Sequence, residues 1–481
     1  MKTSSFNIPG SGSATVRALT TVLCLLISMG AGAQQKAGEV QHLQGMATAQ
    51  QAGGTVRFLV KGDTVLTGDT LTTTDKGFAV LALGDGSKIT LRPATTFAVE
   101  SFAYETAQDG AVLRLLRGGM RAVTGLINRR NPGSVQVRTS TATIGIRGTS
   151  FDARICGDDC RQEETVLAGR PNPPQPVPPA DSVVARVVRL KGEASAVQAG
   201  KPARKLQEGA PLYTGDEVRT ANDATAVLGF RDQSKLSLNP DTAFRITGFS
   251  YNRPKEPDTF AAFLIRGGLR VFTGLIGKGD PKAMALSTRL STIGIRGTGM
   301  DISCDGPCAE PPLTMAVSAV PARTDGLFMV TWLGQTYFSG SCGDLDVNTG
   351  AGGFVGADCA ARPLAAIPDF MLAFEAPRPD EVDVDWTKLF GATASTGADG
   401  LYVFVRDGAL SLITRVGQTD LGVGETGHVG ADGQSRRLNP VPRFMSDDPF
   451  PIPEFFTQSE NRILQLFGAT LGQPGQDICR L

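Results

Sequence analysis

The chain has 481 residues, which is too long for one ordinary hydrophobic core, so two to four domains are expected. Charged residues make up 20% and apolar residues 41%, a composition that excludes a disordered chain. Lys and Arg together number 47, as do Asp and Glu, so no overall charge points to nucleic acid or an anionic membrane surface. The 58 glycines and 29 prolines interrupt short apolar runs and predict a turn-rich, all-β protein.

The first segment has the pattern of an export signal. Lys2 and Arg17 precede an apolar run at residues 18–29, which is followed by small residues up to Ala33. This pattern predicts a signal peptide over residues 1–33 and a periplasmic or secreted protein. An uncleaved anchor is disfavoured because the run is shorter than the ~20 residues that a spanning helix needs. We expect no membrane span after cleavage.

A long internal repeat organises the residues that follow. Two blocks recur in the same order, namely 68–104 as 215–251 and 117–149 as 266–298. The offset is 147 for the first block and 149 for the second. This two-residue difference falls in the polar stretch of residues 105–112, which we therefore expect to be a surface loop. The matching blocks indicate a duplicated domain.

Each copy alternates short strands with glycine-rich turns. In the first copy, residues 78–83 are a continuous apolar run, residues 84–87 read Gly-Asp-Gly-Ser, and apolar and polar residues alternate over 88–91. A glycine-rich turn between two short β-patterned runs predicts a β-hairpin. The same alternation over residues 135–138 and 144–147 predicts two more half-buried strands.

The motifs of both copies stand in one order. A Gly-Asp turn is followed by a strand of the Gly-Ser-Lys-Ile-Thr-Leu type, an Arg-Gly-Gly-x-Arg segment and an Ile-Gly-Ile-Arg-Gly-Thr run. This order resembles the FecR domain, an extracytoplasmic β-rich module first known from iron-uptake regulators. The resemblance implies an all-β protein with two tandem FecR-like domains, at residues 34–160 and 183–308, each a roll or solenoid of short strands.

Residues 161–182 form the predicted linker between the two copies. Six prolines fall between positions 171 and 179. Such a composition favours a stiff, extended polyproline II spacer, which would hold the two domains apart.

A second, shorter repeat follows the two copies. Residues 324–371 and 398–445 match at an offset of 74 and predict two small β units, with residues 446–481 as a C-terminal tail. In the FecR domain a strand pair of this kind closes the domain, and residues 422–429 resemble its closing stretch. The sequence leaves open whether each unit closes one of the upstream copies. In the tail, Ser459 is a candidate N-cap for a short helix.

Four cysteines stand in two pairs just after the Ile-Gly-Ile-Arg-Gly-Thr runs. They are Cys156 with Cys160, and Cys304 with Cys308, each pair separated by three residues. In an oxidising compartment this spacing favours two small disulfide loops. The alternative is a zinc site made of four thiolates that joins the two copies.

The remaining cysteines are less regular. Cys342 and Cys359 of the first β unit correspond to Val416 and Gly433 of the second. Because both cysteines are replaced together, we predict that they form a third disulfide. Cys479 is then left over, as a free thiol or as a bridge between two chains.

Two repeat-equivalent arginines and one acidic segment are candidate binding residues. Arg147 and Arg296 occupy the same place in the two Ile-Gly-Ile-Arg-Gly-Thr runs, and we favour buried guanidinium groups that hold turn carbonyls over a ligand contact. Asp344, Asp346 and Asn348 have the spacing of calcium ligands. A strand with its acids facing outward gives the same spacing, and the sequence favours that strand.

Catalytic motifs are scarce in this chain. His42 and His428 are the two histidines, and neither has a nucleophile motif nearby. Residues 422–427 match a dinucleotide-binding pattern, but no helix pattern follows them. We therefore predict no catalytic, cofactor-binding or metal-binding residue and expect a protein that is not an enzyme.

These observations favour a binding or scaffolding module of the cell envelope, whose partner is an envelope protein or glycan rather than nucleic acid. The alternative is a cell-surface signalling component related to FecR-type anti-sigma regulators. The resemblance implies that such regulators carry a cytoplasmic domain and a spanning helix ahead of the FecR domain, whereas only residues 1–17 precede the apolar run. A carbohydrate-active enzyme is a third hypothesis with no supporting motif.

Overall fold

The computed structural model describes residues 35–169, 182–253, 256–309, 326–340, 343–391, 398–451 and 453. Within these residues the protein is all-β and contains two sheets of 15 strands each, which confirms the predicted fold class. None of the helices in the described part is long and apolar enough to cross a membrane. The predicted signal peptide, the proline-rich stretch and the tail beyond residue 453 lie outside the described residues.

The first domain is built on the first sheet. Its strands are β1 (Lys36–Gln44), β2 (Ala47–Gln50), β3 (Arg57–Phe58), β4 (Thr64–Leu66), β5 (Thr70–Thr73), β6 (Phe78–Leu83), β7 (Lys88–Leu91), β8 (Thr96–Ala103), β9 (Gly110–Val123), β10 (Val135–Arg138), β11 (Thr143–Cys156), β27 (Gly400–Ile413), β28 (Gln418–Gly422), β29 (Thr426–Val429) and β30 (Ser435–Leu438). Its helices are α2 (Leu126–Arg130), α3 (Asp158–Ala168) and α7 (Arg443–Ser446).

The second domain is built on the second sheet. Its strands are β12 (Val183–Lys191), β13 (Ala194–Val197), β14 (Arg204–Lys205), β15 (Pro211–Tyr213), β16 (Glu217–Thr220), β17 (Thr225–Phe230), β18 (Lys235–Leu238), β19 (Ala243–Ser250), β20 (Thr259–Phe272), β21 (Met284–Ser287), β22 (Thr292–Asp305), β23 (Gly326–Ser339), β24 (Leu345–Asn348), β25 (Gly352–Val355) and β26 (Ala361–Pro363). Its helices are α4 (Leu275–Gly279), η1 (Pro281–Ala283), η2 (Gly306–Cys308), α5 (Asp369–Leu372), η3 (Pro379–Glu381) and α6 (Trp386–Phe390).

The two sheets have the same strand order. The main path of the first sheet is β3-β2-β5-β8-β9-β10-β11-β27-β29-β30, and that of the second is β14-β13-β16-β19-β20-β21-β22-β23-β25-β26. In both sheets the last strand of the FecR-like copy pairs along its length with the long first strand of a closing unit. The duplication seen in the sequence is therefore a duplication of the whole sheet.

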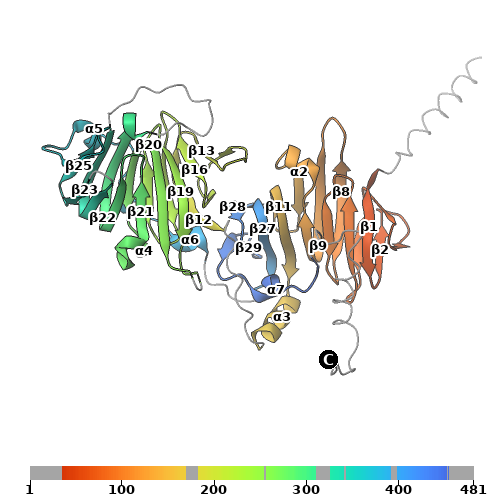
Figure 1. The fold of residues 1–481 in the computed structure, drawn as a ribbon. Helices are drawn as coiled ribbons and strands as arrows, with labels where there is room; N and C mark the ends of the chain where they lie inside the picture. Colours follow the sequence, from red (N-terminus) through yellow and green to blue (C-terminus); the bar gives the residue numbers. More distant parts are fainter. Residues whose placement is uncertain are drawn as a thin grey trace, which may run out of the picture.

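The closing units are nested, and this settles the point that the sequence left open. β22 pairs with β23, so the first unit closes the second copy, whereas β11 pairs with β27, so the second unit closes the first copy. Figure 1 shows the blue β27 beside the gold β11, with the green second domain to one side. The predicted segments are thus parts of two domains, and the second domain is inserted into the first.

Each closing unit contributes to the core of its domain. Leu401, Val403 and Leu412 of β27 are buried in the core of the first domain. Met329 and Phe338 of β23 are buried in the core of the second domain. Because burial of one such side chain stabilises a fold by about 1.5–3 kcal/mol, neither copy is a complete folding unit without its closing strands.

The predicted surface loop is shorter than expected. β8 ends at Ala103 and β9 begins at Gly110, so the loop covers residues 104–109. Residues 110–112 belong to β9 because they continue its pairing with β8.

Candidate interaction face

Two local disulfides follow the ends of β11 and β22. Cys156 bonds Cys160, with Cα atoms 5.4 Å apart, and Cys304 bonds Cys308, with Cα atoms 5.3 Å apart. This confirms two predicted pairs and excludes the zinc alternative, because all four sulfur atoms are used in disulfides. The predicted pair of Cys342 and Cys359 remains a prediction, since Cys342 lies outside the described residues, as does Cys479.

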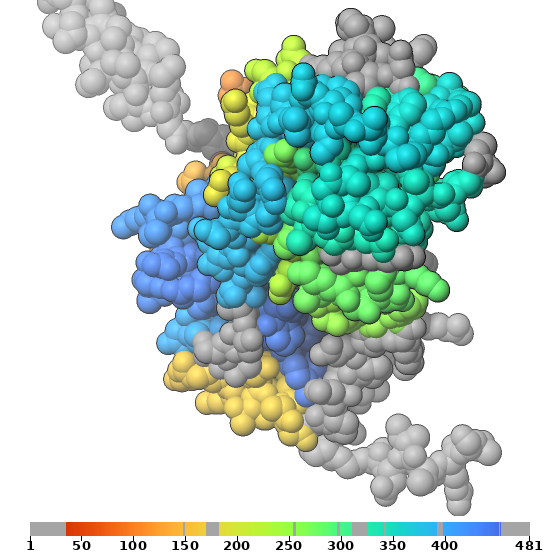
Figure 2. Space-filling view, turned by 90° about the vertical axis from the view of Figure 1, so that its left-hand side faces the viewer, coloured from red at the N-terminus to blue at the C-terminus, as the bar shows by residue number. Residues whose placement is uncertain are grey.

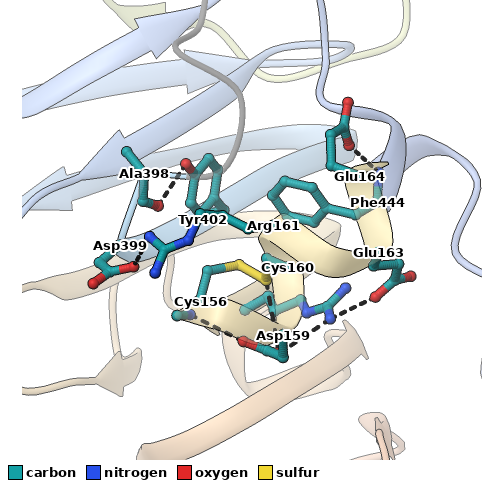
Figure 3. The surroundings of a disulfide bond; sticks show 12 residues. Cys156, Asp159, Cys160, Arg161, Glu163, Glu164, Ala398, Asp399, Tyr402 and Phe444 are labelled. Carbon is teal, nitrogen blue, oxygen red and sulfur yellow. Dashed lines mark hydrogen bonds and ion pairs between the residues drawn. A yellow bond between two sulfur atoms is a disulfide. The ribbon is translucent and has the colours of Figure 1, made fainter. Parts of the chain in front are cut away.

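The first disulfide positions α3, which joins the two halves of the first domain (Figure 3). Glu164 of α3 accepts a hydrogen bond from the backbone N–H of Phe444, at 3.0 Å, at the start of α7. Arg161 Nη1 lies 2.6 Å from Asp399 Oδ1, at the point where the chain returns from the inserted domain. The two ends of the insertion therefore lie close together.

A strap crosses the outer face of each sheet after the closing unit. This name refers to residues 447–451 of the first domain and residues 373–382 of the second. Arg121 of β9 binds Asp152 of β11, with Nε 2.8 Å from Oδ1, and its guanidinium also donates to the carbonyl of Phe450. A buried, paired arginine thus holds the strap of the first domain.

The second domain repeats this contact with the equivalent arginine. Arg270 of β20 donates to Asp301 at 3.1 Å and to the carbonyl of Ala376 at 3.0 Å. Its guanidinium carbon also lies 5.5 Å from the ring centroid of Phe374, which belongs to the same strap. The two straps are therefore held on their sheets in the same way.

The two domains meet at a joint with an apolar centre. Val183 and Tyr213 of the second domain pack against Val423 of the first, together with Phe390 of α6. A Cβ atom on Gly422 would clash with the Tyr213 hydroxyl oxygen, so glycine is needed for this close approach. In Figure 2 the segment that carries α6 lies between the green second domain and the darker blue closing unit of the first domain.

Charged groups surround this apolar centre. Arg186 is fully buried and forms an ion pair with Glu425, which is 5% exposed. Arg231 Nη2 lies 3.5 Å and Arg437 Nε 3.9 Å from the same carboxylate. Burial, followed by the nearby charge of Arg186, lowers the pKa of Arg437 to about 10.

A hydrogen bond between the domains completes the joint. Gln207 of the second domain donates to Asp420 of the first at 2.7 Å, and Ser411 and Gln418 also donate to this carboxylate. Burial would raise the pKa of Asp420, but these hydrogen bonds outweigh it, so the pKa lies below its ordinary value. The joint therefore fixes the two domains through matched polar groups and a small apolar seam. The expectation that the linker holds the two domains apart is wrong, because these groups pack the domains against each other.

An apolar surface lies at the other end of the first sheet, on β2 and β3. Val56, Phe58 and Val60 are 55%, 74% and 61% exposed, and Met46 is 59% exposed. Phe58 pairs with Thr48 of β2, so these alternate residues share one face of the β2–β3 ribbon. We call the surface formed by Met46, Val56, Phe58 and Val60 the β2–β3 face.

The second domain carries charged and polar residues in place of this surface. At the offset of 147, Glu193 and Lys205 replace Met46 and Phe58 and form an ion pair. Gln207 replaces Val60 and belongs to the joint. Charged side chains protect an edge strand from unwanted pairing, so the second domain has a protection that the first domain lacks.

The structure also corrects the interpretation of Arg147. Arg147 is exposed rather than buried, because it points outward from β11 opposite Ala409. The side chain of Arg296 lies outside the described residues. Leu345–Asn348 form strand β24, as the strand interpretation of the acidic segment predicts. Within the described residues no three His, Cys, Asp or Glu side chains form a group suited to a metal ion.

The two histidines lie in different strands, His42 in β1 and His428 in β29. His428 of β29 packs on Tyr402, with ring centroids 4.5 Å apart, and its Nε2 lies 3.1 Å from the carbonyl oxygen of Asp399. Burial lowers the pKa of His428, and that of His42 is lowered by burial and by Lys61. His428 is therefore mainly a packed, neutral side chain at neutral pH.

Sequence reasoning missed both the joint and the β2–β3 face. A usable signal existed in the repeat, since the two copies differ in charge at the joint and at the β2–β3 face. Glu425 corresponds to Ala351 and Arg186 to Glu39, while Phe58 corresponds to Lys205. These substitutions change charge at positions where the surrounding fold is the same.

Comparison with known proteins agrees with the sequence motifs. A family model described as FecR protein matches residues 69–170 and 216–309. Two solved structures of a proposed anti-sigma factor from Parabacteroides distasonis ATCC 8503, at 1.65 and 2.50 Å resolution, were compared with this chain. Their sequences are 10% and 11% identical to it, and the TM-scores are 0.23 and 0.24. The aligned region covers 31% of this chain and 58% of those chains. No curated protein matches the chain. Two FecR segments thus stand in tandem in this protein.

Proposed function

We propose that this protein is a non-enzymatic, extracytoplasmic binding protein of the cell envelope. Its two FecR-like domains form one unit, and the first domain binds a partner protein through the β2–β3 face. The observation that carries this proposal is the contrast between the two copies. The first copy exposes Met46, Phe58 and Val60, where the second copy has Glu193, Lys205 and Gln207.

The occupant that best fits this face is an extended protein segment. β3 lies at the end of the strand path, and among the described residues it pairs with β2 alone. An extended segment can add to such an edge through backbone hydrogen bonds, while its alternate side chains pack beside Val56, Phe58 and Val60. Because the face carries no charge, the matching segment is apolar at every second residue.

The exposed face also needs an explanation in terms of solubility. A flat, apolar edge invites pairing with other chains, and large exposed apolar patches mark interaction sites. The two disulfides are typical of an oxidising compartment, which supports a location outside the cytoplasm. The protein would then meet its partner in the envelope.

The FecR match favours a second, related function. In that case binding at the β2–β3 face would serve cell-surface signalling, as a component related to FecR-type anti-sigma regulators. Because such a signal has to cross the membrane, the extended segment would then belong to a partner protein that spans it.

The test places a photo-crosslinking side chain at position 58 and identifies the crosslinked peptide in cells. The partner's binding to purified protein is then compared for wild type and for Phe58→Lys, which introduces the residue of the second copy. If Phe58 is a central apolar contact, its replacement should reduce the binding free energy by at least ~2 kcal/mol. The dissociation constant would then rise by roughly 30-fold or more. Val416→Lys, at a residue 65% exposed elsewhere in the first domain, serves as the control and should leave binding unchanged.

Three outcomes would contradict this proposal. A crosslink to a glycan would show that the partner is not a protein. A crosslink to a second copy of this chain would show self-association instead of binding to a partner. Equal binding by wild type and Phe58→Lys would show that the β2–β3 face is not the site.

A further inference from the structure

Helix α6 of the second domain is the starting point. Its N-cap Asp385 accepts a hydrogen bond from the backbone N–H of Lys388 at 2.9 Å. The helix sits directly on β17, because a Cβ atom on Gly229 would lie 3.0 Å from Leu389 and 3.1 Å from Trp386. The small residue at position 229 thus provides the surface on which α6 packs.

The segment that precedes α6 is the strap of the second domain. After the strap contact at Ala376, the carbonyl of Val382 accepts a hydrogen bond from Lys235 of β18 at 2.7 Å. The chain then reaches α6 at Trp386. Strap and helix therefore form one continuous cover along the outer surface of the second domain.

The sequence of α6 recurs in the C-terminal tail. Residues 389–393 read Leu-Phe-Gly-Ala-Thr, and residues 466–470 read the same. At this offset of 77, Ile463 corresponds to Trp386, so the apolar residues of α6 have apolar counterparts. The straps themselves match at the offset of 74, so the tail contains three additional residues before the repeated segment.

The strap of the first domain leads toward the equivalent surface. Phe450 packs edge-on against Phe78 of β6, with ring centroids 5.8 Å apart, and the carbonyl of Pro451 accepts a hydrogen bond from Thr90 of β7 at 3.2 Å. Ile463 is ten positions after Pro453, and an extended chain of that length spans up to about 33 Å. The tail is therefore long enough to reach β6 and β1.

The receiving surface carries a small residue at the matching position. Ala82 of β6 corresponds to Gly229 and is partly exposed, so a small side chain is again present where the helix would approach most closely. In the second domain, a Cβ atom on Gly229 would also lie 3.0 Å from the side chain of Val188. The residue of the first domain that corresponds to Val188 is Gln41 of β1. Ala82 and Gln41 therefore occupy the same places in the first sheet as Gly229 and Val188 in the second.

We propose that residues 463–468 form a counterpart of α6 and dock on β6 and β1 of the first domain. Leu466 takes the place of Leu389, and Ile463 takes the place of Trp386. In the second domain, α6 is also held by the closing unit of the first domain, since Arg437 donates to the carbonyl of Lys388 at 2.8 Å. That closing unit already contacts α6, so the proposed docking uses the surface of β6 and β1 instead.

Thiol crosslinking in the full-length protein tests the docking. The variant Ala82→Cys with Leu466→Cys, in a Cys479→Ser background, is treated with a short bis-maleimide and mapped by peptide mass spectrometry. Gly229→Cys with Leu389→Cys is the positive control, because these positions are in contact in the second domain. Lys205→Cys with Leu466→Cys pairs the tail with an exposed position of the second domain and serves as the negative control.

We expect the 82–466 link within one chain at a yield at least ~10-fold above that of the 205–466 pair. A link between two chains, seen as a dimer on a denaturing gel, would instead show docking onto a second copy and would overturn the proposal. So would the absence of the 82–466 link in a preparation where the 229–389 link forms. None of these outcomes depends on the β2–β3 face.

Discussion

Arg186 of the inserted domain is buried against Glu425 of the domain that surrounds it. The two residues are 239 positions apart in the chain, and each belongs to a different domain. A buried ion pair is weak evidence for stability in itself, because desolvation offsets the attraction. The pair does select which surfaces of the two domains meet. In any other arrangement, one of the two charges would be buried without an opposite charge beside it.

The first prediction concerns Glu425→Ala. The variant leaves Arg186 and its neighbouring arginines without their carboxylate, so the free energy of unfolding should fall by about 3–5 kcal/mol. Urea denaturation measures this loss. The same fold tolerates alanine here, since Ala351 is the repeat-equivalent residue, so a large loss reports on the joint. The double variant Arg186→Met, Glu425→Leu should recover much of the stability.

The matched control is Asp432→Ala, which removes an exposed ion pair with Arg436 in the same closing unit. We expect it to leave the unfolding curve almost unchanged. If Glu425→Ala behaved like this control, the joint would not hold the domains together.

The nesting of the domains gives the second prediction. Arg161 and Asp399 bring the two ends of the insertion together, so residues 170–397 can be replaced by a short Gly-Ser linker. The first domain should then still fold, with a lower melting temperature because Val423 and Glu425 lose their partners. A chain that ends at residue 391 should instead fail to fold its first domain, because β27 supplies part of that core. Circular dichroism and formation of the Cys156–Cys160 disulfide report both results, and a folded first domain in the shorter chain would contradict the nested pairing.

The sequence predicted features that depend on neighbouring residues and on the repeat. Strand alternation, glycine turns and the cysteine pairs are local patterns, so the β class and the disulfides Cys156–Cys160 and Cys304–Cys308 followed from them. The pairing of β11 with β27 did not, because sheet pairing is set by contacts distant in sequence and any strand of similar pattern fits. The joint was hidden for another reason, since Arg186 and Glu425 look like ordinary surface charges until two domains meet.

The third prediction concerns the double variant Cys156→Ser, Cys160→Ser. Loss of this small loop should lower the free energy of unfolding by about 2 kcal/mol on the chain-entropy model. The loss should also loosen α3, because the disulfide sets its first turn, and Glu164 would hold α7 less firmly. Hydrogen exchange at the Phe444 amide should therefore increase. The matched variant Cys304→Ser, Cys308→Ser should leave exchange at Phe444 unchanged, and an equal effect of both variants would argue against this local role.

The last prediction concerns pH and His428. Burial lowers the folded-state pKa of this ring below its ordinary value of 6.5, so the unfolded chain binds a proton more readily. Stability should therefore fall as the pH decreases from above 6.5 toward the lowered pKa. The repeat supplies the test, because Phe354 occupies the equivalent position and packs on Phe328 at 4.6 Å, as His428 packs on Tyr402. His428→Phe should keep the packing and reduce the loss of stability between pH 7 and 5, measured by urea denaturation at each pH. His42, whose pKa is also lowered, should account for part of the remaining dependence, so His42→Gln is measured in parallel. A variant His428→Phe with the pH dependence of the wild type would mean that this ring is not a source of acid sensitivity.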